Sequence, residues 1–447
     1  MKTSNVLDVI DQAMFDVARA VGGASQLQCI WVYNRPVDVD GLRRFHDHLR
    51  RGRLSRRIEQ SPLPFGRHRW VAPAGSSDIE IVESARPREE FDAWLTEQCK
   101  TPLDCEGGPG WHLAVLPFTD GGAGVSLVIS HCLTDGVGLC EALADAALGR
   151  DDPISWPAAG SRGRWKALWE DTWQTVRDIP AVGRGVVAAA RLARRSRGGT
   201  GAGTPPTTPP PALSASADES ITLPWATIFV DTDEWEARAQ ALGGTSNSLL
   251  VGLAARLAQR AERIGEDGSV LVVLPVNERG AGDTRANAVS SVRVTVDPAR
   301  AASDLREIRT AIKQALIRHR RVPDEERAVN ALVPLLPRRL LGGASGAMAG
   351  FTSNVVGGSN LGVVNPAASR PDGSDADQFA VLNIPSGVTK AKTYRGGGLQ
   401  LLLSGTANGQ FFVSVASYLL DRPNSNDSLR QDLSSTLNDF SLTGTHL

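Results

Sequence analysis

Residues 124–136, which read GVSLVISHCLTDG, place a histidine between a predicted strand and a predicted helix. The apolar run Val125–Ile129 predicts a buried strand, and a helical pattern with Leu139 and Leu143 follows. His131 lies on the same predicted face as Val125 and stands where the strand ends. Rigid elements on both sides of a histidine are what a positioned base requires.

The residue types of this stretch favour base chemistry. Imidazole titrates near neutral pH, so His131 can take a proton from a hydroxyl or amine that attacks an acyl carbonyl. Asp135 is suited to hold the loop, and Gly136 permits a turn. The same residues also suit a core histidine beside an aspartate that caps a helix. The motif alone leaves both interpretations open.

The rest of the chain predicts an α+β fold, because hairpins and long helices occur without regular βαβ alternation. Strands are expected at Gln26–Tyr33, Trp111–Phe118, Gly124–His131, Thr227–Val230, Val270–Val276, Val289–Val296, Leu399–Leu403 and Gln410–Ser417. Helices are expected at Val6–Arg19 and around residues 42–49, 91–95, 139–146, 165–176, 249–257, 305–316 and 429–440, with Asn247 as the cap of the helix that begins near 249.

Length and composition predict two units. At 447 residues the chain exceeds the usual size of one domain, and residues 196–220 are dominated by Pro, Gly, Ser and Thr. We therefore expect an N-terminal lobe at 1–195, a linker or crossover loop at 196–222, and a C-terminal lobe at 223–447.

Charge and cysteine content exclude several classes of protein. A net charge of -1 offers no general attraction to nucleic acid, so we expect no nucleic-acid partner. The first 20 residues contain acidic side chains, unlike a signal peptide, and no apolar run is long enough to span a membrane. The five cysteines include no C-x-x-C pair. These features predict a cytoplasmic protein without disulfides.

Other chemistries find little support. Cys132 should point away from the imidazole of its neighbour, which argues against a Cys–His nucleophile. His46 and His48 are two residues apart on a predicted helix and do not share a face, so we expect no metal. Nucleotide-binding glycine motifs are missing. No bound cofactor is expected.

The spacing His131-x-x-x-Asp135-Gly136 resembles the active-site motif of the CoA-dependent acyltransferase superfamily. This superfamily includes peptide-synthetase condensation domains, plant BAHD acyltransferases and the bacterial wax ester synthase/diacylglycerol acyltransferases. The chain is most similar to the last group, over nearly its whole length. Further segments resemble that group in the same order: Pro64-Phe65-Gly66, Trp70-Val71, Thr245–Leu250, Pro275–Arg279, Asn287 and Ser353-Asn354-Val355.

The sequence departs from this pattern at three places. Ser130 replaces the first of two histidines, Val356-Gly357 replaces Pro-Gly, and Ser404-Gly405 replaces Ser-Tyr. The second histidine of the family motif is the base, so the first change leaves the mechanism in place. The others line the expected acceptor side, so acceptor identity is not carried over.

The resemblance implies two chloramphenicol-acetyltransferase-like lobes with a substrate tunnel between them and His131 at its middle. An acyl-CoA or acyl-carrier thioester is then the co-substrate, and no covalent acyl-enzyme forms. Asp135 is implied to pair with Arg279. Asn247, Ser353 and Asn354 become candidates for facing the substrate and the oxyanion.

The leading functional expectation is O-acylation of a small-molecule alcohol by a small-molecule thioester donor. Amide formation or carrier-dependent condensation is the first alternative, and a non-catalytic lipid-binding relative is the second. The intact His131, Asp135 and Gly136 argue against the second alternative.

Three tryptophans with helical spacing, Trp165, Trp169 and Trp173, precede a run of arginines. This combination suits a membrane interface, which would place the protein peripherally on the inner face of a membrane. Packing of the tryptophans on the N-terminal lobe is the alternative.

Overall fold

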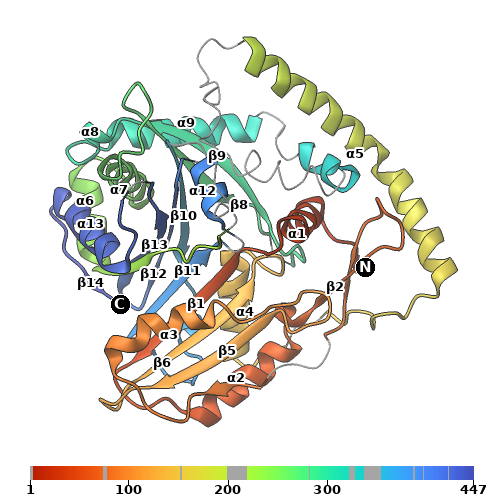
Figure 1. The fold of residues 1–447 in the computed structure, drawn as a ribbon, viewed down its shortest axis with the longest axis horizontal. Coiled ribbons are helices and arrows are strands. Elements are labelled where there is room, and N and C mark those ends of the chain that lie inside the picture. Colours follow the sequence, from red (N-terminus) through yellow and green to blue (C-terminus); the bar gives the residue numbers. More distant parts are fainter. Residues whose placement is uncertain are drawn as a thin grey trace.

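The computed structural model describes residues 4–73, 78–151, 154–198, 219–280, 282–321, 328–336, 354–385, 388–395, 397–420 and 422–447. Two large β-sheets, each with helices packed against it, form two lobes (Figure 1). The α+β, two-lobed architecture expected from the sequence is therefore confirmed.

The first lobe contains a five-stranded sheet of order β11-β1-β6-β5-β4. Its strands are β1 (Gln26–Tyr33), β4 (Glu80–Ile81), β5 (Trp111–Pro117), β6 (Ala123–Ser130) and β11 (Gln378–Ile384). Its helices are α1 (Val9–Val21), α2 (Val39–Arg51), α3 (Phe91–Gln98) and α4 (Gly136–Ala147), and β2 (Arg57–Glu59) and β3 (Arg69–Val71) form a separate hairpin. All of β6 is buried because both faces of this sheet are covered.

The second lobe contains a seven-stranded sheet of order β14-β7-β13-β12-β10-β8-β9. Its strands are β7 (Trp225–Asp231), β8 (Val270–Asn277), β9 (Val289–Val296), β10 (Val355–Val363), β12 (Leu399–Ala407), β13 (Gln410–Tyr418) and β14 (Thr445–His446). Its helices are α6 (Thr232–Ala241), α7 (Ser246–Arg260), α8 (Pro298–Ala301), α9 (Arg306–Arg321), α12 (Lys390–Arg395) and α13 (Asn426–Asp439). The apolar side of α7 lies in the main core of this lobe.

Strand β11 ties the two lobes together. Although it comes from the second half of the chain, it pairs with β1, with Gln26 opposite Ile384. The ring of Phe379 on β11 packs edge-on against Phe412 on β13, with 6.1 Å between ring centroids. The chain therefore returns from the second sheet to complete the first.

The proposed linker at 196–222 is described only at its ends, and the division of the chain there stays a prediction. Residues 196–198 end α5 (Arg164–Gly198), and Ser220 forms an isolated bridge with Thr389. The segment 199–218 lies outside the described residues. Helix α5 runs along the outside of the molecule (Figure 1).

Some expected boundaries were wrong. The helix predicted from Val6 begins at Val9, because the Asp8 side chain accepts from the Ile10 amide and caps it. Asn247 does not cap α7: Thr245 does, in a reciprocal capping box with Ser248. None of the helices in the described ranges is both long and apolar enough to cross a membrane.

Candidate active site

His131 lies directly after β6, one residue beyond the end of the strand. The predicted strand included it, but pairing with β1 ends at Ser130, opposite Gln26. The His131 amide donates to the carbonyl of Ser25 at 2.9 Å, so the backbone stays fixed next to the start of β1. The side chain is partly exposed. A rigid strand thus presents an accessible imidazole.

Asn287, just before β9, sets the protonation pattern of this imidazole. His131 Nδ1 lies 3.0 Å from Asn287 Oδ1. Asn287 Nδ2 donates to the His131 carbonyl at 3.1 Å and to Asp11 Oδ1 at 3.3 Å. Both of these partners accept, which orients the amide, so Nδ1 must carry the ring proton. Nε2 of the neutral ring is then the unprotonated, basic nitrogen.

Asp11, on α1 of the first lobe, holds the backbone that carries Asn287. Its carboxylate accepts from the amides of Ala286 and Asn287 at 2.9 and 2.8 Å. Burial raises the pKa of Asp11 to about 6, against an opposing attraction from Arg56. Asp11 was not among the predicted site residues, although the sequence places it beside the apolar face of an N-terminal helix.

Asp135 joins helix α4 to the same segment of the second lobe. Its Oδ1 accepts from the Gly138 amide at 2.7 Å and caps α4. Its Oδ2 accepts from Arg279 Nη2 at 2.7 Å and from the Ala288 amide at 2.8 Å. The side chains of Asp135 and Arg279 are both only 3% exposed. The structure therefore brings these two residues together, and Asp135 is both a helix cap and an ion-pair partner.

Two glycines make room for these contacts. A Cβ on Gly136 would lie 2.7 Å from Cδ2 of Leu361, and the backbone of Gly136 is not left-handed, so this glycine gives room to the leucine side chain and is not required by turn geometry. A Cβ on Gly138 would lie 2.8 Å from Nη2 of Arg279. Gly138, two residues beyond the motif, was not singled out from the sequence.

Asn247 lies at the same end of the second sheet as this cluster. Its Oδ1 accepts from Nδ2 of Asn360 on β10 at 2.7 Å. The next residue on β10, Leu361, lies against Gly136 of the motif. Asn247 is exposed, and its Nδ2 has no hydrogen-bond partner among the described residues. Asn360 carried no recognisable signal in the sequence.

Of the other two substrate-facing candidates, the structure describes only Asn354. Ser353 lies outside the described residues. The Asn354 carbonyl accepts from Leu271 at the beginning of β8, whereas Arg279 follows the end of that strand. At ~3.3 Å per residue, the length of β8 separates the two ends by roughly 20 Å. Asn354 therefore lies at the opposite end of β8 from Arg279, and its role as an oxyanion donor stays a prediction.

Cys132, His46 and His48, the alternatives considered from the sequence, have other partners. A hydrogen bond with Cys105, together with burial, raises the pKa of the Cys132 thiol well above its ordinary value. His46 packs edge-on against Trp111 at 5.2 Å, and His48 Nδ1 pairs with Asp151 at 2.9 Å. Among the described residues no group of three potential ligands could hold a metal ion.

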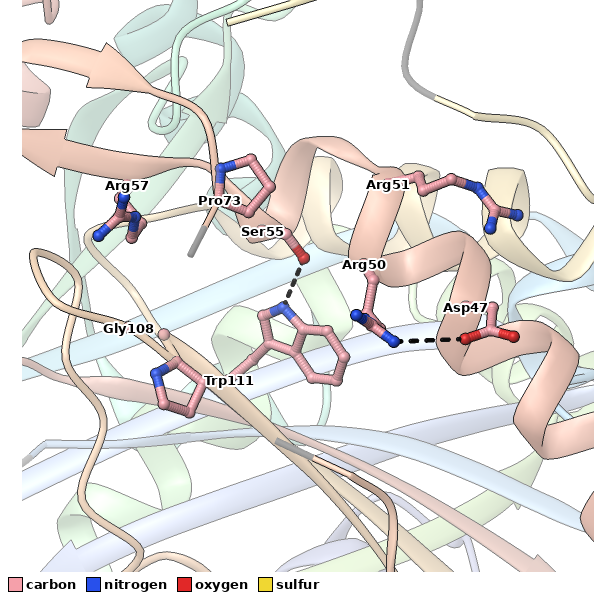
Figure 2. Close-up of a pocket in the computed structure, with 10 residues that line it drawn as sticks. Asp47, Arg50, Arg51, Ser55, Arg57, Pro73, Gly108 and Trp111 are labelled. Atoms are coloured by element: carbon pink, nitrogen blue, oxygen red, sulfur yellow. Dashed lines mark hydrogen bonds and ion pairs between the residues drawn. The ribbon is translucent and has the colours of Figure 1, made fainter. Parts of the chain in front are cut away.

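A cavity of about 340 Å³ lies between the end of α2 and the start of β5 (Figure 2). Trp111 forms part of its wall and donates to Ser55 Oγ at 3.1 Å. Its arginines are engaged by protein groups: Arg51, for example, donates to Asp151. His131 does not line this cavity, so the tunnel implied by the resemblance remains an expectation.

The Asp135–Arg279 contact predicts strong coupling in stability. Replacing either residue by Ala leaves a buried charge without its partner and should lower the free energy of unfolding by about 3–5 kcal/mol. The double variant should lose less than the sum of the two. Denaturant unfolding of all four proteins measures this, and additive losses would show that the pair contributes no coupling.

Burial of Asp11 predicts a pH dependence. Its folded pKa of about 6 lies above the ordinary carboxyl value, so the folded state holds this proton more tightly. Stability should therefore fall, by about 3 kcal/mol at most, as the pH rises from 4 to 6, and then level off. Unfolding of the protein and of Asp11→Asn across this range isolates the effect, since the variant should lack this decline. Parallel curves would contradict the assignment.

No protein-family model matches the chain, and no curated protein sequence matches it. Solved structures do. The first condensation domain of the CDA synthetase superposes with a TM-score of 0.57 at 12% identity, over 98% of this chain and 96% of that one. The wax ester synthase/diacylglycerol acyltransferase from Marinobacter aquaeolei VT8 gives 0.53 at 16% identity, over 98% and 100%. The epimerization domain from the third module of tyrocidine synthetase B gives 0.52 at 15%, over 98% and 95%. The chain therefore has the two-lobed fold that these condensation-type proteins share, as the resemblance predicted.

Proposed function

We propose that this protein is an acyltransferase that moves an acyl group from a thioester to an alcohol, with His131 as general base. The observation that carries the proposal is the contact between His131 Nδ1 and Asn287 Oδ1, which leaves Nε2 basic and the ring partly exposed. The similar folds of a wax ester synthase/diacylglycerol acyltransferase and of condensation domains support the same reaction class.

In the proposed reaction, Nε2 takes the hydroxyl proton while the acceptor oxygen attacks the thioester carbonyl carbon. The tetrahedral intermediate then collapses, the carbon–sulfur bond breaks, and the imidazolium returns the proton to the leaving thiolate. The acyl group never bonds to the protein. Asp135 and Arg279 hold the loop that carries the base, and do not touch the reacting atoms.

Stabilisation of the oxyanion requires a donor opposite the base. Asn247 Nδ2 is the first candidate, because its Oδ1 is already bonded to Asn360. Ser353 and Asn354 stay candidates through the resemblance alone. The donor is proposed as acyl-CoA or an acyl-carrier thioester, in a tunnel between the lobes.

Amide formation is the second candidate, and the likeness to condensation domains favours it. The base chemistry is the same for an amine acceptor, so the acceptor side decides between the two. Release of free thiol from acyl-CoA, followed with a thiol dye over a panel of alcohols and amines, separates them. Turnover with alcohols supports O-acylation, and turnover with amines alone supports the second candidate. Turnover with neither, and with no carrier-bound donor, supports a non-catalytic relative.

Replacement of the base gives the first prediction of this mechanism. His131→Ala should lower kcat by about 10²–10⁴, because general base catalysis contributes that much. The melting temperature should change little, since the side chain is partly exposed. Thiol release and a thermal melt measure the two quantities. Undiminished turnover by the folded variant would exclude His131 as the base.

Replacement of Asn287, the residue that orients the base, gives the second prediction of this mechanism. Asn287→Ala removes the acceptor of the Nδ1 proton, so both ring tautomers become populated and kcat should fall by about 10–100-fold. KM for the donor should change little, and the pH at half-maximal kcat should shift. A variant with altered stability but an unchanged pH profile would indicate that Asn287 is only structural.

A further inference from the structure

Helix α5 exposes the side that a packed helix would bury. Trp165, Trp169 and Trp173, spaced by four residues, are 86%, 70% and 50% exposed. The alternative in which this stripe packs on the lobe was therefore wrong. Figure 1 shows the helix along the edge of the molecule, away from both sheets.

The inner side of α5 attaches the helix to the first lobe through polar contacts in its first half, and further along Gly185 lies buried against Ala328 and Leu332. The side chain of Asp171 is fully buried and accepts from Arg69 Nη2 and Arg162 Nη1, each at 2.9 Å, and from Ser61 Oγ at 2.7 Å. About two helical turns further on, the Asp178 carboxylate accepts from Arg67 Nη1 at 3.3 Å. Because these contacts involve the inner side of α5, its apolar stripe faces away from the rest of the chain and is free to contact another surface.

The apolar stripe continues beyond the tryptophans. At roughly 100° per residue, the next apolar positions return to the same side of the helix. These are Val176, Ile179, Val186 and Val187, exposed by 47%, 61%, 55% and 49%. A continuous apolar face of this length on one exposed helix is typical of an interaction surface.

Arginines line one edge of this face. Arg177, Arg184 and Arg191 are seven residues apart and all exposed. The guanidinium of Arg177 lies 5.6 Å from the ring centre of Trp173. After Asp178, the helix contains no acidic residue up to its end at Gly198. The exposed face is therefore apolar, with a cationic edge.

We propose that α5 docks this protein on an anionic lipid surface, with its axis in the plane of the membrane. Tryptophans sit at the boundary between headgroups and acyl chains, and arginines attract anionic headgroups. A second copy of the chain fits this face less well. A two-fold dimer through α5 would bring the arginines of both copies close to each other, and the second half of the helix offers no acidic residue to pair with them. The proposal does not depend on the reaction catalysed.

Vesicle flotation of the full chain tests this directly. The protein should float with vesicles that contain phosphatidylglycerol and phosphatidylcholine, and not with phosphatidylcholine alone. Substitution of the three tryptophans of the stripe by Gln should weaken partition more than about tenfold. Quenching of wild-type tryptophan fluorescence by brominated phosphatidylglycerol reports the contact without any variant.

The arginine row has a matched control. Changing Arg177, Arg184 and Arg191 together to Gln should reduce partition roughly 100-fold, at ~1 kcal/mol per charge. The same change at three exposed arginines elsewhere should leave it unchanged; Arg43, Arg44 and Arg300 have side chains 65%, 68% and 72% exposed.

Four results would overturn the proposal. These are no flotation and no quenching by the folded protein, equal binding to neutral vesicles, undiminished binding by the folded tryptophan variant, or equal losses in the two arginine variants. A dimer that the tryptophan substitutions convert to a monomer, without vesicle binding, would instead identify a second copy as the occupant. Short-chain thiol release should remain in the tryptophan variant, so this test and that of the catalytic function fail separately.

Discussion

The buried ion pair between Asp135 and Arg279 is the constraint on which the geometry of the site depends. The two carboxylate oxygens of Asp135 connect three parts of the fold: the first turn of α4, the Arg279 guanidinium after β8, and the backbone that leads into β9. Charges taken out of water need close pairing and hydrogen bonds. Arg279 Nη1 and Nη2 also donate to the carbonyls of Arg285 and Ala286, although its buried Nε has no partner in the described part of the chain. The lobes must therefore meet in one register at this point, and Gly138 leaves the space for it.

Asp11 adds a second connection between the lobes on the other side of the same backbone segment. Asp11 accepts from the consecutive amides of Ala286 and Asn287. The side chain of Asn287 in turn contacts the imidazole of His131 and so fixes its orientation. The residues Ala286–Ala288 are therefore held by two carboxylates of the first lobe, Asp11 on α1 and Asp135 at the N-terminus of α4. Such a segment has little freedom to move, which is the property that a precisely oriented base requires.

Helix α5 differs from the rest of the chain in which side chains it exposes. In the cores, apolar residues face inward and polar residues reach water, whereas α5 is attached through Asp171 and exposes Trp165. Burial of the Asp171 carboxylate is compensated by Arg69 and Arg162, so these ion pairs help to hold the inner side of the helix while the tryptophans stay outside. The proposed membrane surface would give the apolar face the environment that the protein does not provide.

Local patterns in the sequence were sufficient for the strand, turn and helix around His131, for the strands Leu399–Leu403 and Gln410–Ser417, and for the α+β class. These features depend on neighbours a few residues apart, where side-chain period and turn chemistry act directly. The family resemblance added the pairing of Asp135 with Arg279, which lie 144 residues apart. Asp11, Asn360 and the place of β11 in the first sheet emerged only from the tertiary structure, because their partners are distant in the chain and no local pattern encodes them. The same holds for α5: its period predicted the tryptophan stripe, but only packing of the opposite face decided that the stripe is exposed.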